Sequence, residues 1–364
     1  MSAKIAFVVL GMHRSGTSSV AGTLARLGAA RPRHEMEAAD DNPRGFFESR
    51  LIGELNDRIL EAGGSWWSDW RRFDPAGLEP SVLADFREEI AQTLRQEFDG
   101  APTLVLKDPR LCRLGGVWSG VLESLGYRRI DLLPLRSPME VAGSLQARNG
   151  MDVAQGLALW LRHVLDAERD TRGGARLLLP WNDFMRDWRG ALAPLTALTG
   201  EPLDLSRAPE IESYLSLGLR NQVVADETLA TAPENHAWAT EAYACLVSAA
   251  RGDGEKAALT RLDHIRDRFE TASDLFGRAV AADLRRARES EGVGPSTAER
   301  ADYLRSLEGL KALLDMERQT TEAMRVERDA ARDAAGSAVA VAEERRRIYE
   351  ERLRRSTRAL IRNG

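Results

Sequence analysis

The chain has 364 residues, of which 43% are hydrophobic and 29% charged, and its formal net charge is -5. This length fits one medium-sized α/β domain with an additional segment, rather than two full catalytic domains. The acidic balance argues against a general nucleic-acid-binding protein, which would be basic, although a few local arginines can still hold a small anion. We therefore expect no nucleic acid among the partners.

The first predicted strand begins close to the N-terminus. The apolar stretch Ile5–Leu10 is too short for the core of a secretory signal and leads directly into a glycine-rich loop. The sequence contains no run of about eighteen apolar residues, so no membrane span is expected. The two cysteines, Cys112 and Cys245, are too few and too isolated to predict a disulfide framework or a zinc site. We expect reduced thiols and a cytoplasmic location.

Four short apolar runs are typical of strands buried in a parallel sheet, at residues 4–10, 103–107, 130–135 and 176–181. Helical patterns separate them, at about 18–27, 82–98, 116–125 and 139–148. Strands that alternate with helices predict an α/β fold with a doubly wound parallel sheet and flanking helices. Such a fold binds its ligands at the carboxyl ends of the strands.

The composition changes after about residue 235, and from Ala257 onward the chain is rich in Arg, Glu and Ala without strand-like runs. Apolar residues keep alternating spacings of three and four over 262–279 and, after a break at Gly292–Pro295, over 307–342. This spacing favours a long helix or coiled coil. The alternatives are a solvated single helix or a disordered tail past about Ser296, and pairing with a second copy stays open.

The segment at residues 11–19 (GMHRSGTSS) follows the first predicted strand and opens a helix. This arrangement points backbone N–H groups and the positive end of the helix dipole at an anion. Gly16 lets the backbone approach the ligand closely, and Arg14 can add a charge-assisted bond. The spacing of the two glycines matches the start of a Walker A loop, but Thr17 stands where the lysine belongs. The sequence therefore predicts an anion-binding loop that suits an ordinary ATPase poorly.

The pattern Gly11-x-x-Arg14-Ser15-Gly16-Thr17-Ser18 resembles the 5′-phosphosulfate loop of sulfotransferases that use 3′-phosphoadenosine-5′-phosphosulfate (PAPS). Its Arg-Ser-Gly form is that of the carbohydrate and tyrosylprotein branches and of many bacterial relatives. The resemblance implies a P-loop-like fold. It also implies that the donor's 5′-phosphate and sulfuryl end are bound by Arg14, Ser15, Gly16, Thr17 and Ser18.

A second motif lies after the third predicted strand. Arg136 follows that strand, Pro138 suits the first position of a new helix, and Ser144 lies within this helix. In the sulfotransferase family, an arginine at a strand end and a serine on the next helix clasp the 3′-phosphate of the donor. The resemblance therefore implies that Arg136 and Ser144 are donor-binding residues.

A third motif, Lys107-Asp108-Pro109-Arg110, ends the second predicted strand. A lysine at this edge can neutralise charge on the oxygen that bridges sulfur and phosphorus as that bond breaks. The segment resembles the Lys-Asp-Pro motif of the tyrosylprotein branch, in which the lysine has such a role. Asp108 and Arg110 are expected to orient the turn or to face the acceptor.

The general base has two candidates. The stretch Asp41–Glu48 looks like the Asn-Pro-x-Gly-aromatic-Glu segment of bacterial members, and a carboxylate can take a proton from an acceptor hydroxyl. Glu48 is the preferred base, and its alternative is a glutamate that satisfies a helix dipole. His13, inside the loop, is the rival base. A further cluster of Trp66, Trp67 and Trp70 either stacks on sugar faces or closes a core.

We expect an enzyme that transfers a sulfuryl group from PAPS to a hydroxyl or amine, with PAP as the product and no metal. Arg14, Lys107 and Glu48 are its expected catalytic residues, and a carbohydrate or glycolipid is the expected acceptor, by analogy alone. The alternatives are a nucleotide kinase with a degenerate P-loop and an inactive nucleotide-binding head of a coiled-coil interaction protein. The predicted division is a catalytic domain at 1–235, a helical extension at 236–291 and a long helix or coiled-coil tail at 292–364.

Overall fold

The computed structural model describes residues 4–38, 42, 44–216 and 237–289. The chain divides into one compact unit at Met1–Arg288 and a second unit at Glu289–Gly364. The predicted tail at 292–364 lies outside the described residues, so its coiled coil and its pairing with a second copy stay predictions.

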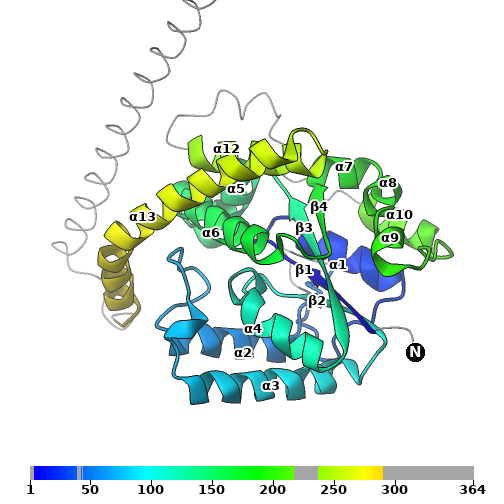
Figure 1. Cartoon of the computed structure of the whole chain (residues 1–364), viewed down its shortest axis with the longest axis horizontal. Helices are drawn as coiled ribbons and strands as arrows, with labels where there is room; N and C mark the ends of the chain where they lie inside the picture. The colour runs from blue at the N-terminus through cyan, green and yellow to red at the C-terminus, as the bar shows by residue number, and fades with distance from the viewer. Residues whose placement is uncertain (1–3, 39–41, 43, 217–236, 290–364) are drawn as a thin grey trace, which may run out of the picture. The chain divides into compact units, whose positions relative to one another are not determined.

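A four-stranded parallel sheet forms the centre of the first unit (Figure 1). Its strands lie in the order β2-β1-β3-β4, with bounds β1 Lys4–Val9, β2 Thr103–Lys107, β3 Tyr127–Leu135 and β4 Arg176–Pro180. All four predicted strands are confirmed. β3 begins three residues before its predicted start, because Tyr127 and the two arginines after it pair in register with the beginning of β1. Hydrogen bonding to a neighbouring strand, rather than apolar composition, makes this stretch part of the sheet.

Helices connect and cover the strands, with bounds α1 Thr17–Arg26, α2 Arg50–Ala62, α3 Pro80–Phe98, α4 Leu111–Ser124, α5 Pro138–Asn149, α6 Val153–Thr171, α7 Trp181–Arg186, α8 Trp188–Leu192, α9 Leu195–Thr199, α10 Ala208–Ser216, α12 Ala237–Ala250 and α13 Glu255–Glu289, besides the 3₁₀ turn η1 Pro75–Gly77. Local chemistry explains several starts. The Ser49 side chain accepts a hydrogen bond from the Ile52 N–H at the start of α2, and a proline begins α3 and α5. The four predicted helices of the α/β region are confirmed, although α4 begins five residues earlier than predicted.

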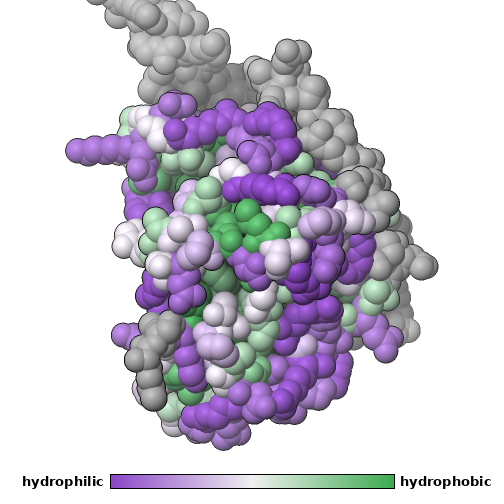
Figure 2. Space-filling view, turned by 90° about the vertical axis from the view of Figure 1, so that its right-hand side faces the viewer, coloured by the Kyte–Doolittle hydropathy of each residue, from purple (hydrophilic) through white to green (hydrophobic). Residues whose placement is uncertain are grey.

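The two faces of the sheet are covered by different helices. Ala6 and Val8 of β1 pack in a core with α2, α3 and α4, whereas Phe7 and Val9 pack in a core with α1, α8 and α10. This alternation follows from the two-residue period of a strand. A third core joins α5, α6, α12 and α13 (Figure 1). The surface turned to the viewer in Figure 2 is mainly hydrophilic, with apolar residues confined to small patches.

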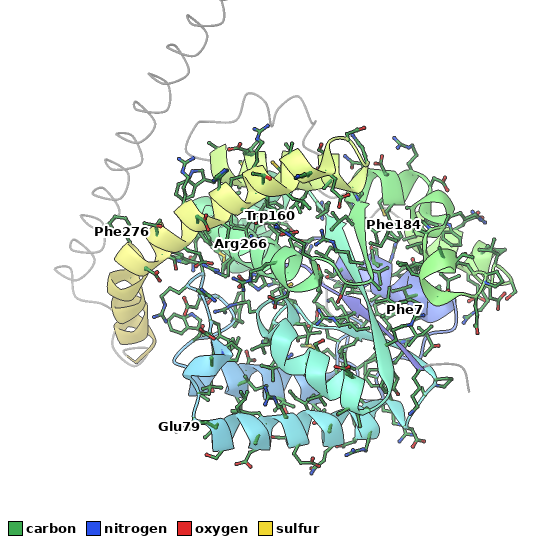
Figure 3. The ribbon with its side chains drawn as sticks, in the orientation of Figure 1. Phe7, Glu79, Trp160, Phe184, Arg266 and Phe276 are labelled. Carbon is green, nitrogen blue, oxygen red and sulfur yellow. The ribbon has the colours of Figure 1, made fainter. Side chains whose placement is uncertain are left out.

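The long helix predicted from the spacing of residues 262–279 is confirmed as part of α13. Its apolar residues Leu262, Ile265 and Phe269 are buried in the core that includes α6. A buried ionic network reinforces this packing: Arg266 of α13, labelled in Figure 3, donates a 2.7 Å hydrogen bond to Glu168 of α6. Burial alone would raise the pKa of Glu168, but its bonds with neighbouring arginines, Arg172 first, lower that pKa instead. The early turns of α13 are therefore integral to the compact unit.

Acidification should destabilise the fold through His163 of α6. Its buried ring hydrogen-bonds the Leu159 carbonyl at 2.8 Å, and burial, together with the charges of Arg113, Arg162 and Arg110, lowers its pKa to about 3. The unfolded chain binds a proton at this histidine below about pH 6.5, while the folded chain resists it. The free energy of unfolding should therefore decrease as pH falls from about 6.5 towards 3.

Urea unfolding of the wild type and of His163→Phe at several pH values between 7 and 4 tests this expectation. The variant should be less stable at neutral pH, because it lacks the hydrogen bond, but its stability should depend less steeply on pH. An unchanged slope in His163→Phe would contradict the assignment.

Candidate functional site

The carboxyl ends of all four strands meet at one edge of the sheet. The loop of residues 11–16 follows β1, Lys107 ends β2, Arg136 follows β3, and Trp181 follows β4. β1 lies between β2 and β3, so the strands that follow β1 in the chain are added first on one side of it and then on the other. Such a topological switch point is where open α/β sheets bind ligands.

The loop after β1 has the backbone shape of an anion cradle. Arg14 and Gly16 both lie in the left-handed region, with φ of 71° and 86°. A Cβ atom on Gly16 would lie 2.2 Å from the Trp181 ring, so this position requires glycine on steric grounds as well. A non-glycine residue such as Arg14 in this conformation stores strain, which proteins concentrate at functional sites.

The predicted hydroxyls of this loop have different surroundings. Ser15 Oγ is buried and has no hydrogen-bond partner among the described residues. Thr17 is buried at the first position of α1, and half-buried Ser18 donates a 3.4 Å bond to the Phe46 carbonyl. An unpartnered buried hydroxyl is costly in a folded protein unless a ligand or water completes its bonding. Ser15 Oγ is therefore the atom of this loop whose bonding a ligand would complete.

The residues predicted for the two ends of a nucleotide lie together. Arg14 Nε donates a 2.8 Å hydrogen bond to Ser144 Oγ of α5, and Arg136 Nη1 donates a 3.0 Å bond to the Arg14 carbonyl. The loop after β1 and the clasp after β3 are thus on the same side of the sheet. The contact between Arg14 and Ser144 is closer than the sequence indicated, because the Arg14 guanidinium extends across to α5.

Two residues of this region were missed by sequence reasoning. Glu140 accepts a 2.7 Å hydrogen bond from Arg136 Nε, and its position four residues after Arg136 at the start of α5 was a readable signal. The Trp181 ring lies 5.8 Å from the Arg136 guanidinium carbon and against Gly16. Trp181 Nε1 and Ser137 Oγ are buried without a partner in the described part of the chain.

Lys107 and Glu48 form a buried ion pair at the end of β2. Only 4% of Lys107 and 3% of Glu48 is exposed, and Lys107 Nζ also donates to the Phe46 carbonyl at 3.1 Å and to Ser18 Oγ at 3.4 Å. Burial raises the pKa of Glu48, although the charge of Lys107 opposes that effect. A carboxylate with a raised pKa is a stronger base. The alternative role for Glu48 was to satisfy the dipole of a helix. Glu48 does lie directly before Ser49, the N-cap residue of α2, but its carboxylate binds Lys107.

Asp108 orients the turn after β2. Its carboxylate accepts hydrogen bonds from the Arg110 N–H and from Arg110 Nη1, each at 2.9 Å, and from Asn56 Nδ2 at 3.1 Å. Arg110 is bound on its other side by Asp57, at 2.6 and 2.8 Å. These contacts favour the orienting role over the acceptor-facing one for both residues, and they hold the backbone that carries Lys107.

His13 of the loop after β1 lies against Trp67. Its ring centroid is 5.4 Å from that of Trp67, in an edge-on arrangement. Burial, followed by the charges of Arg148, Lys107 and Arg110, lowers the pKa of His13 well below its ordinary value. The imidazole is therefore neutral at neutral pH, and these cations make it a weak proton acceptor.

A separate hollow of about 590 Å³ lies at the other end of α1. Arg26, the last residue of α1, lines it together with Arg44 and Tyr214, and the Arg26 guanidinium carbon lies 3.9 Å from the Tyr214 ring centroid. A ten-residue helix is about 15 Å long, which separates Arg26 from the cradle at the start of α1.

Within residues 4–38, 42, 44–216 and 237–289, no group of three or more His, Cys, Asp or Glu side chains is placed to hold a metal ion. No helix in the same ranges combines the length and the apolar character that crossing a bilayer requires. Cys112 and Cys245 are both buried free thiols.

The fold defines the chain as an α/β protein with a parallel sheet, and the loop after β1 includes two residues in the left-handed conformation. The chain is similar to the sulfotransferase domain of the olefin synthase from Synechococcus PCC 7002, with 19% identity and a TM-score of 0.39 over 66% of this chain and 94% of that domain. It is also similar to a sulfotransferase domain from the curacin biosynthetic pathway, with 16% identity and a TM-score of 0.33 over 61% of this chain and 79% of that one. No family model and no curated protein matches the chain.

Proposed function

We propose that the chain is a sulfotransferase that moves a sulfuryl group from PAPS to a hydroxyl or amine. The observation that carries this proposal is the buried pair of Lys107 and Glu48, which lies beside an anion cradle at the switch point of the sheet. A cation and a basic carboxylate in contact are the two groups that sulfuryl transfer requires of a protein: one for the leaving oxygen and one for the acceptor proton.

The residues beside the cradle fit the donor. The left-handed loop and Ser15 Oγ, which lacks a partner among the described residues, suit the 5′-phosphate and the sulfuryl group. Arg136 and Ser144 suit the 3′-phosphate. Arg14 Nε donates to Ser144 Oγ, and this hydroxyl can still donate its own proton to a phosphate oxygen. Bonds from a guanidinium to phosphate are charge-assisted and therefore strong.

The proposed reaction is an in-line displacement at sulfur. The acceptor oxygen forms a bond to sulfur as the bond between sulfur and the bridging oxygen breaks, and that oxygen leaves with the 5′-phosphate of PAP. Glu48 receives the acceptor proton, and Lys107 neutralises the charge that develops on the leaving oxygen. Positioning and electrostatics supply the rate enhancement, so the proposal includes no metal.

The proposal also covers the domains, the location and the acceptor of the chain. The catalytic domain is expected at 1–235 with its helical extension at 236–291, in a cytoplasmic chain whose acceptor is a carbohydrate or glycolipid. Since α13 shares the α6 core, a truncation that tests the role of the tail should end after residue 289. A nucleotide kinase is the competing function, and magnesium-dependent ATP binding would favour it.

Calorimetric titration with PAP and with ADP tests the donor site. The two nucleotides differ at the 3′-phosphate and at the 5′ end, so the expected result is tight binding of PAP and weak binding of ADP. Arg136→Ala should weaken PAP binding by about 10- to 100-fold, because a hydrogen bond to a charged group contributes about 1.5–3 kcal/mol. The same variant should weaken ADP binding less, because ADP lacks the 3′-phosphate and is affected only through the Arg14 carbonyl that Arg136 holds.

Arg50, an exposed arginine at the start of α2, provides a matched control, because its side chain pairs only with Glu54 among the described residues, at the protein surface. Arg50→Ala should bind PAP like the wild type. Equal losses for PAP and ADP in Arg136→Ala would remove the 3′-phosphate role, and wild-type binding of ATP with magnesium but not of PAP would overturn the proposed function.

A further inference from the structure

The three tryptophans of one loop differ in their ring contacts, although Trp67 and Trp70 are both partly buried against the core that includes α6 and α13. The loop at residues 63–73, here called the tryptophan loop, joins α2 to the turn before α3. Trp66 is buried, and the Trp70 ring lies 6.1 Å from that of Phe269 on α13. Trp67 is half-buried, and its ring meets His13 of the anion-binding loop edge-on at 5.4 Å. In this cluster, it is Trp67 that reaches the candidate site.

Two buried arginines hold the tryptophan loop through its backbone. Arg113 of α4 donates to the Trp66 carbonyl at 2.8 Å and to the Arg71 carbonyl at 3.1 Å. Arg162 of α6 donates to the Trp70 carbonyl at 2.9 Å. Burial lowers the pKa of Arg113 to about 10, because the charged guanidinium is less stable away from water. These bonds fix the loop on both sides of Trp67.

Trp67 contacts the loop after β1 through the His13 ring. Burial and the charge of Arg148, followed by those of Lys107 and Arg110, lower the pKa of His13, and Lys107 contacts Glu48. The Trp181 ring lies against Gly16 and beside Arg136, among the residues assigned to the donor. Trp67 meets the loop at His13 instead, a different residue from those assigned to the donor phosphates.

We propose that Trp67 is the residue that binds the acceptor, by packing its indole against the apolar face of a ring that carries the reacting hydroxyl. The inference rests on the proposed function. A rigid indole suits the flat, apolar face of a sugar ring or of a phenol. The hydroxyl of that ring would then donate its proton either to a carboxylate oxygen of Glu48 or to an imidazole nitrogen of His13. The two buried arginines act through Trp67 as positioning residues.

Steady-state kinetics of Trp67→Ala, Trp67→Phe and Trp70→Ala test this inference, with 4-nitrophenol and methyl N-acetylglucosaminide as the two acceptors. Trp67→Ala should raise the KM for the acceptor about tenfold or more, because it removes both aromatic contact and buried apolar area. Trp67→Phe should recover part of that loss. The Kd for PAP should change less than about twofold in either variant.

Trp70→Ala is the matched control, because it removes the same side chain from the same loop at a position that faces Phe269. It should lower Tm and leave the acceptor KM almost unchanged. The acceptor for which the wild type has the lower KM, 4-nitrophenol or methyl N-acetylglucosaminide, indicates whether the site prefers a phenol or a sugar. An unchanged acceptor KM in Trp67→Ala, or a Kd for PAP that rises as much as the KM, would overturn the role of Trp67.

Failure of the two proposals gives different results. A wild-type chain that does not bind PAP removes the proposed function. If the wild type binds PAP but transfers a sulfuryl group to neither of the two ring hydroxyls, the inference that the acceptor is a ring is wrong, and the donor site is unaffected.

Discussion

Replacing Lys107 with methionine should lower kcat by roughly 10²- to 10³-fold while the Kd for PAP changes little. Methionine keeps much of the volume of the lysine stem at this buried position but removes the ammonium group, which lies beside Glu48 and the Phe46 carbonyl. Charge on the leaving oxygen develops during the transfer, so the loss should fall on the transition state. Calorimetry with PAP and steady-state kinetics measure the two quantities separately.

The control for Lys107→Met is the same change at the other end of the sheet. Lys4 begins β1, and its ammonium group lies 5.1 Å from the Tyr127 ring centroid, at the amino ends of the strands. Lys4→Met should therefore leave kcat unchanged. Thermal unfolding identifies any loss of structure in Lys107→Met, because this variant leaves Glu48 buried without its cation. A Kd for PAP that rises as steeply as kcat falls would reduce Lys107 to a binding residue.

The parallel sheet was predictable because strands buried on both faces consist of almost continuous apolar runs. Residues 103–107 carry such a run, and the structure places it at β2 without a shift. The start of β3 was not predictable in the same way. Tyr127 and the arginines that follow it are recruited by pairing with Lys4 and its neighbours, which no property of the local sequence records.

The position of a candidate site residue was predictable where it depends on a strand end. Lys107 and Arg136 directly end or follow apolar runs, and the topology brings them to one edge. Contacts across long stretches of sequence were not predictable. Trp181 acts on Gly16 through a steric contact between distant parts of the chain, and the direct bond between Arg14 and Ser144 depends on side-chain conformations that appear only after packing.

The tryptophan loop shows the same limit more clearly. In the sequence, Trp66, Trp67 and Trp70 are equivalent members of one aromatic cluster, and either a sugar-stacking or a core role fitted all three. Buried Arg113 and Arg162 come from helices far along the chain and fix the loop backbone. Tertiary hydrogen bonds of this kind set the ring contacts of each indole, and the local sequence does not record them.

Replacing Glu48 with glutamine should lower kcat by about 10²- to 10⁴-fold and should remove the acidic limb of the pH profile. The base must be deprotonated to accept a proton, so wild-type kcat/KM should rise with pH through the pKa of Glu48. Burial raises that pKa above its ordinary value of 4.5. The loss of activity on acidification should therefore begin at a higher pH than it would for an exposed glutamate. Glutamine keeps the shape of the side chain, so PAP should still bind.

Glu97 supplies the matched control for Glu48→Gln. It is another buried glutamate, it accepts a 2.8 Å hydrogen bond from His34, and it lies near the end of α3, which leads into the amino end of β2. Glu97→Gln should lower Tm and keep both kcat and the pH limb. If the limb persists in Glu48→Gln and disappears in His13→Asn, the imidazole is the base. In that case the carboxylate of Glu48 serves only to hold Lys107, because a group that merely positions its neighbour cannot set the pKa of the reaction.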